Sequence, residues 1–187
     1  MRLTFPDPPL AAGGVALRRL SGDDVPWITE ACGDRELSRH VPAIPFPYSQ
    51  ADARAFVARA ARDWAAGEGA VFVIARADTG VGLGTVGLHL TPADPGLGTV
   101  GYWLCRDARG QGSATSALRL VSGWAFADLG IERLQLITAP ENMPSQRVAE
   151  RAGFTREGLL RAWLPTPQGR RDSVMFSLLD TDISARR

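Results

Sequence analysis

The chain has 187 residues, of which 45% are hydrophobic and 22% are charged, and this length and composition are typical of one globular domain with one buried core. A formal net charge of +1 gives no basis for a nucleic-acid or anionic-membrane surface, and two cysteines are too few for a disulfide framework. No signal-peptide pattern opens the sequence and no apolar run approaches the roughly 18 residues of a membrane helix, so we expect a cytoplasmic protein without nucleic acid or membrane as a partner.

A single domain is expected over residues 15–180. Residues 1–14 hold prolines and glycines among few apolar side chains, which predicts a loosely ordered N-terminal segment. A strand is expected at residues 15–19, and a helix should start near Ser21. Residues 181–187 are expected to form a C-terminal tail.

The segment 41–48 contains three prolines between apolar residues, which excludes a helix and predicts a packed loop. Such a loop either forms a wall of a substrate pocket or only packs beneath the next helix. Ser49 and Asp52 form a capping box for that helix, which should end near Gly67.

Three antiparallel strands are predicted next. Residues 70–76 and 81–90 alternate as two strands of a hairpin, and residues 91–98 form a turn rich in proline and glycine. A third strand follows directly from Thr99.

The most informative stretch is 99–127, where an apolar strand is joined to a helix by a basic, glycine-rich turn. The turn reads R-G-Q-G-S-A over residues 109–114. Glycines let the backbone present consecutive N–H groups, the helix start adds its own unpaired N–H groups, and Arg109 adds a charge that a pyrophosphate can accept bidentately. The sequence therefore predicts a cradle for a phosphorylated cofactor. The apolar stripe of the helix comprises Ala114, Ala117, Leu118, Val121, Trp124 and Ala125.

Two nucleotide motifs fit this turn poorly. A P-loop requires a lysine, and the turn contains none; a dinucleotide fingerprint requires a third glycine where Thr115 stands. The remaining alternative is an ordinary strand-to-helix turn whose glycines only relieve strain.

The last third of the chain predicts a parallel crossover and a final hairpin. Gly130 ends the long helix, and a strand at 131–138 should pair in parallel with the strand before that helix. A short helix opens at Asn142, and the segments 154–163 and 172–179 are predicted to form the hairpin.

The glycine-rich turn resembles the cofactor-binding motif of the GNAT superfamily of N-acetyltransferases. In that motif a basic or Gln residue is followed at fixed spacing by two small residues, here Arg109, Gly112 and Ala114. The flanking words V-G-Y-W-L and S-A-T-S-A-L are similar to the RimJ/RimL-type branch of ribosomal-protein N-terminal acetyltransferases. A later signature of this branch matches Asn142, Ser145, Gly153 and Phe154.

The resemblance covers about residues 15–179 and implies an α/β fold of the α+β type, with a mixed sheet of about six to seven strands and about four helices. It implies transfer of an acetyl group from acetyl-coenzyme A to a primary amine, either a protein N-terminus or a small molecule. A backbone N–H at Leu104 or Cys105 would polarise the donor carbonyl, and no metal is implied. The implied cofactor-binding residues are Leu104, Cys105, Arg106, Arg109, Gly110, Gln111, Gly112, Ser113, Ala114, Thr115, Asn142 and Ser145.

The resemblance makes Ser145 a candidate hydrogen-bond donor to the thioester sulfur, although helix capping alone also accounts for it. The general base is harder to place, because many relatives carry glutamates where Thr99 and Ser116 stand here. His89 is the first candidate in their place, with Asp94 behind it and Glu141 also considered. An α-amine, with a pKa near 8, needs roughly three kcal/mol less help than a lysine amine.

Two alternatives stay open at this point. The missing carboxylates also fit an acyl-CoA-binding or interaction module that has lost catalysis. A larger donor such as succinyl-CoA is compatible with Arg39 or His40 near the proline-rich loop. Many relatives form homodimers, which the sequence neither supports nor opposes.

Overall fold

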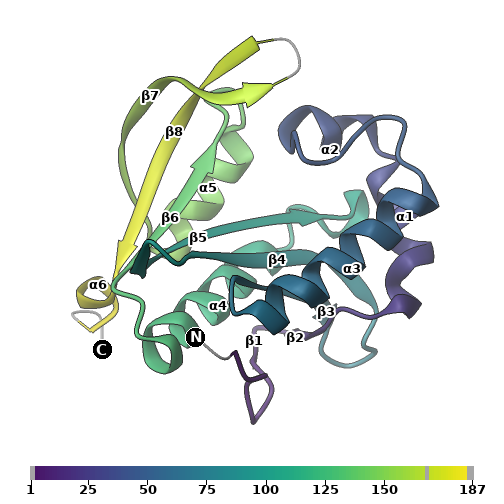
Figure 1. Cartoon of the computed structure of the whole chain (residues 1–187), viewed down its shortest axis with the longest axis horizontal. Coiled ribbons are helices and arrows are strands. Elements are labelled where there is room, and N and C mark those ends of the chain that lie inside the picture. The colour runs from purple at the N-terminus through teal and green to yellow at the C-terminus, as the bar shows by residue number, and fades with distance from the viewer. Residues whose placement is uncertain (1–2, 167–168, 185–187) are drawn as a thin grey trace.

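The computed structural model describes residues 3–166 and 169–184. Its elements in chain order are β1 (Ala11–Ala12), β2 (Val15–Arg19), η1 (Gly22–Asp24), α1 (Val25–Cys32), α2 (Arg35–His40), α3 (Gln50–Ala66), β3 (Gly69–Arg76), β4 (Gly82–Thr91), β5 (Asp94–Leu104), η2 (Arg106–Ala108), α4 (Ser113–Leu129), β6 (Arg133–Thr138), α5 (Met143–Ala152), β7 (Thr155–Thr166), β8 (Gly169–Leu179) and α6 (Asp180–Ser184). The strands form one mixed sheet in the order β1, β2, β3, β4, β5, β6, β8, β7, and helices cover both of its faces (Figure 1).

The two halves of the sheet diverge between β5 and β6. These strands pair in parallel over only three residues of each, with Leu97 opposite Arg133 and Thr99 opposite Gln135. Beyond that point β5 continues beside β4 to Leu104, while β6 continues beside β8, and Figure 1 shows the two strands separating. The backbone groups on this edge of β5 therefore have no strand partner beyond the short ladder.

Helix α4 fixes the position of the glycine-rich turn. Ala117, Leu118 and Val121, from its predicted apolar stripe, are fully buried against side chains of the central strands such as Phe72 and Val86. Burying a side chain of the size of Leu118 or Val121 contributes roughly 1.5–3 kcal/mol. The start of α4 is thus held rigidly beneath the diverging strands.

The prediction of an α/β mixed-sheet fold is confirmed, with eight strands in place of six to seven. The sequence also missed helix α2, because only Leu37 among its six residues is buried and no apolar period marks it. Asp34 caps this helix by accepting a hydrogen bond from the backbone N–H of Glu36 at 3.0 Å. The C-terminal segment begins as a helical turn, α6, and residues 185–187 lie outside the described chain.

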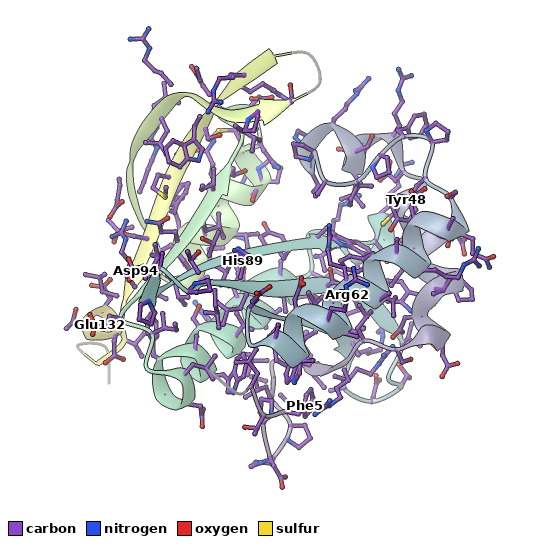
Figure 2. The ribbon with its side chains drawn as sticks, in the orientation of Figure 1. Phe5, Tyr48, Arg62, His89, Asp94 and Glu132 are labelled. Atoms are coloured by element: carbon purple, nitrogen blue, oxygen red, sulfur yellow. The ribbon has the colours of Figure 1, made fainter. Side chains whose placement is uncertain are left out.

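Residues 3–12 differ from the loosely ordered segment that the sequence predicts. Leu3 is buried, and the ring of Phe5 lies 5.7 Å from that of Phe72 and 6.1 Å from that of Trp64 (Figure 2). Strand β1 then pairs with β2. Two apolar side chains and a short ladder are enough to hold a segment whose composition otherwise suggests disorder.

Candidate functional site

Two pockets lie on opposite sides of β5, just beyond the point where β6 leaves it. The first has a volume of about 220 Å³ and the second about 550 Å³, and both are bounded by Val41, Tyr102 and Trp103. Side chains alternate across a strand, so Tyr102 faces the side of α4 and α5 whereas Trp103 packs with α1, α2 and α3. A ligand in one pocket can therefore meet a ligand in the other across this end of β5.

The start of α4 provides the floor of the first pocket. Gly112 is its N-cap at φ +84°, a conformation that a residue with a Cβ adopts only with strain. Its carbonyl accepts the N–H of Ser116 at 3.0 Å, so the N–H groups of Ser113 to Thr115 precede the first helical hydrogen bond. No acidic side chain stands in this turn. These N–H groups and the positive end of the helix dipole suit an anionic group.

Arg109 is held by helix α2. Its guanidinium donates to Asp34 Oδ2 at 2.7 Å, to Glu36 Oε2 at 3.1 Å and, through Nε, to the carbonyl of Leu104 at 3.3 Å. Burial raises the pKa of Asp34, but the Glu36 backbone bond and the Arg109 guanidinium outweigh it and hold that pKa below its usual value. In this arrangement Arg109 joins α2 to the glycine-rich turn, and the backbone N–H groups of α4 are left as the primary anion donors.

The hydrogen bonds at the end of β5 distinguish between Leu104 and Cys105, the two residues whose N–H could donate to the carbonyl of the acyl donor. The N–H of Cys105 donates to the carbonyl of Leu83 on the β4 side at 2.8 Å. Leu104 is opposite Gly84 in the antiparallel register, so its own N–H and carbonyl point away from β4, toward the side that β6 has left. Leu104 is therefore the amide that the geometry favours.

Tyr102 and Ser145 form a hydrogen-bonded pair across the diverging strands. The Tyr102 hydroxyl donates to Ser145 Oγ at 3.1 Å, and the Ser145 N–H donates to Asn142 Oδ1 at 3.2 Å, which caps α5. Burial raises the pKa of Tyr102, partly offset by the Ser145 bond, so the phenol stays protonated at neutral pH. The sequence identified Ser145 and Asn142 but missed Tyr102, although its position two residues before Leu104 places it on the same edge of β5.

Eight of the twelve residues predicted to bind the cofactor line the first pocket, and four do not. Those that line it are Leu104, Arg109, Gly110, Gly112, Ala114, Thr115, Asn142 and Ser145. Those outside its lining are Cys105, Arg106, Gln111 and Ser113. The structure adds Arg151 of α5 and His40 of α2 to the lining.

The two histidines occupy different surroundings. His89 is exposed on β4, opposite Thr99, and lines neither pocket (Figure 2). His40 ends α2, lines the first pocket, and its Nδ1 is buried without a hydrogen-bond partner within the described part of the chain. Asp94 is exposed at the start of β5, and Glu141 is paired with Arg171. His40 was not among the candidates for the general base in the sequence because helix α2 was not predicted.

The second pocket is enclosed by the proline-rich segment, helix α3 and the sheet. Residues of the segment 41–48 form one wall, and Ile44 in the same segment is also buried in the core. That the pocket walled by this segment takes a substrate stays a prediction. The floor lies over Gly87 and Gly101, which are directly opposite each other on β4 and β5. A Cβ placed on Gly101 would meet nothing within 4 Å, so the absence of these side chains leaves room for a ligand.

Within residues 3–166 and 169–184, no group of three or more His, Cys, Asp or Glu side chains is arranged to hold a metal ion. No helix in that part is long and apolar enough to cross a membrane.

Comparisons with known proteins agree with this geometry. The family model described as acetyltransferase (GNAT) domain matches residues 15–155. The uncharacterized N-acetyltransferase p20 of Bacillus licheniformis is 27% identical over 165 residues, covering 88% of this chain and 92% of that protein. RimJ of Mycobacterium smegmatis, solved with CoA-disulfide, has a TM-score of 0.80 at 22% identity, covering 90% of this chain and 83% of that chain. RimL, a ribosomal α-N-protein acetyltransferase solved with coenzyme A, has a TM-score of 0.81 at 20% identity, covering 91% and 96%.

Proposed function

The chain belongs to the acetyltransferase (GNAT) family, and from that premise we propose that it transfers an acetyl group from acetyl-coenzyme A to a primary amine. The observation that carries the proposal is the meeting of two pockets at Tyr102 and Trp103. The first pocket offers helix N–H groups to a phosphorylated donor, and the second is open to an acceptor. Loss of catalysis is not favoured, because Tyr102 lines both pockets and is hydrogen-bonded to Ser145 in the first.

The donor would lie along the free edge of β5. We assign its pyrophosphate to the N–H groups at the start of α4, with Arg151 of α5 also in the lining of the pocket. The backbone of Tyr102 and Leu104 faces the same gap, and the Leu104 N–H would polarise the thioester carbonyl. Arg109 contributes by holding α2 and the glycine-rich turn together.

The reaction requires the acceptor nitrogen to attack the thioester carbonyl from the second pocket. A C–N bond forms and the C–S bond breaks, giving an amide and free coenzyme A. The nitrogen loses a proton to a base or to water, and the departing thiolate gains one. We assign that second proton to Ser145, resupplied by the Tyr102 hydroxyl with which it is hydrogen-bonded, and Tyr102 regains its proton from solvent.

The test is calorimetric titration with acetyl-coenzyme A, using NAD and ATP as controls, followed by an acetyl-transfer assay on primary amines. We expect micromolar binding of acetyl-coenzyme A alone. Ser145→Ala and Tyr102→Phe should each lower kcat by about 10- to 100-fold while changing the acetyl-coenzyme A affinity by less than about threefold. The double variant should be about as slow as the slower single variant, because the two hydroxyls act in one relay.

Ser38→Ala removes an exposed hydroxyl from α2 that bonds only the Arg35 carbonyl, and it serves as the matched control. Folded protein that binds no acetyl-coenzyme A would refute the proposed function. Intact binding with unchanged kcat in Ser145→Ala and Tyr102→Phe would refute only the proton relay.

The general base is assigned by comparing His40→Gln with His89→Gln. We expect His40→Gln to lower kcat/KM by about 10- to 100-fold, because His40 lines the first pocket. His89→Gln should leave kcat/KM unchanged. The reverse result would return the role to His89, and an unchanged kcat/KM in both variants would assign deprotonation to water.

A further inference from the structure

Helix α3 presents two unpaired cations to the second pocket. Its pocket-lining positions recur at helical spacing and include Arg59 and Arg62, one turn apart. Figure 2 labels Arg62 on this helix. Neither guanidinium has a carboxylate partner or a hydrogen-bond acceptor within the described chain. Arg59 makes a cation–π contact, with its Cζ 5.9 Å from the centroid of Phe56, and lies close enough to Tyr48 to interact with it electrostatically. Both donors are thus available to a ligand.

The single carboxylate in the lining of this pocket, that of Asp52, is already hydrogen-bonded to another residue. Asp52 accepts hydrogen bonds from the backbone N–H of Ser49 at 2.8 Å and from its hydroxyl at 2.5 Å. Those bonds lower the pKa of Asp52 and hold its carboxylate at the helix cap. The pocket therefore carries more positive than negative charge.

The neighbouring walls strengthen the effect of these cations. Phe56, Tyr102 and Trp103 line the same pocket and exclude water from one side of it. A charge interacts more strongly beside such apolar walls than in open solvent. Polycationic amines are disfavoured by this arrangement, since they would meet two arginines and one occupied carboxylate. A carboxylate or phosphate, in contrast, matches the planar donor fork of a guanidinium.

We propose that the acceptor is a primary amine that carries a carboxylate or phosphate group, with Arg59 and Arg62 binding the anion while the amine points toward Tyr102. The proposal rests on the acetyl transfer proposed above and names the acceptor class for that same site. The anion has two sources, the acidic side chains of a peptide N-terminus or the acidic group of a small metabolite. The acceptor set below separates them.

The test uses matched acceptors that differ only in the anion. The peptide pair is Ser-Glu-Glu and Ser-Gln-Gln, both as C-terminal amides; the small-molecule pair is phosphoethanolamine and ethanolamine, with spermidine as the polycation. We expect KM to be at least about tenfold lower for the anionic member of one or both pairs, and that advantage to shrink as salt is added. A preference confined to one pair identifies the source of the anion.

The variants are Arg59→Gln/Arg62→Gln and, as the matched control, Arg54→Gln. Arg54 lies on the same helix outside the pocket lining and donates to Gln50 at 2.7 Å. The double variant should reduce the KM advantage to less than about twofold, while Arg54→Gln keeps it.

Two outcomes would overturn the inference and are distinguishable. Equal KM within both pairs, or an advantage that survives Arg59→Gln/Arg62→Gln, would refute the anionic acceptor and leave acetyl transfer standing. No transfer to any amine by protein that binds acetyl-coenzyme A would refute the transfer and the acceptor class together.

Discussion

Thr115→Asp should weaken acetyl-coenzyme A binding by about 100-fold while leaving the thermal stability of the free protein unchanged or slightly higher. Thr115 is the third residue of α4, half-buried, and lines the first pocket beside the glycine-rich turn. A carboxylate there would repel the donor phosphates. The same carboxylate would interact favourably with the positive end of the α4 dipole, where no acidic side chain now stands. Because the acetyl-coenzyme A affinity should fall while the thermal stability does not, a loss of binding can be distinguished from a loss of folding.

Thr115→Asn is the matched control, because asparagine has the shape of aspartate without its charge. Calorimetry should give an affinity for Thr115→Asn within about fivefold of the wild type, and added salt should narrow the gap between the two variants. Equal weakening by both would indicate a steric effect. Full affinity in Thr115→Asp would place the pyrophosphate away from α4 and contradict the binding mode proposed above.

The turn at α4 was predictable because local signals define it. Gly112 and the spacing of Ala117, Leu118 and Val121 specify a glycine-started helix with one buried face, and the structure has both. The partners of Arg109 were not predictable in this way. Asp34 lies 75 residues away in the chain, on a short helix with one buried side chain, so only the folded chain shows that this cation is already paired.

The second pocket likewise could not be predicted from local sequence patterns. The capping box of Ser49 and Asp52 predicted where α3 begins, but Arg59 and Arg62 look in the sequence like ordinary solvated side chains. Their role depends on a floor made by Gly87 and Gly101, whose pairing across two strands sets the room above it. Local patterns predict elements, whereas sites built from several elements depend on register and packing.

Asp24→Ala should lower the free energy of unfolding by about 3 kcal/mol, the low end of the range for breaking a buried ion pair. Asp24 is 2% exposed, and its carboxylate accepts two bonds from Arg18, at 2.7 and 3.0 Å, one from Trp27 Nε1 at 2.7 Å and one from the Ser21 N–H at 2.9 Å. Alanine would leave the Trp27 and Ser21 donors unpaired, while Arg18 can turn to water because it is partly exposed. Urea denaturation at pH 7 measures the loss.

Asp24→Ala should also weaken acceptor binding in the second pocket. The ring of Trp27 lies 5.8 Å from that of Trp103, which lines both pockets. A displaced Trp27 would loosen that shared wall, so the acceptor KM should rise in Asp24→Ala at temperatures where the variant is still folded. An unchanged KM would show that Trp103 is positioned by its other neighbours.

Asp24→Asn removes the charge of the side chain and keeps its shape, so the pH dependence of its stability measures the contribution of the charge. Burial raises the pKa of Asp24, but the bonds from Arg18, Trp27 and Ser21 outweigh it and hold that pKa below its usual value. A carboxyl whose pKa is lower in the folded state stabilises it above the unfolded pKa of about 4, and this contribution is lost as pH falls through the folded value. The stability gap between wild type and Asp24→Asn should therefore be constant from about pH 5 to 8 and narrow progressively as pH falls below about 4. A gap that does not narrow on acidification would assign the effect to packing around the side chain.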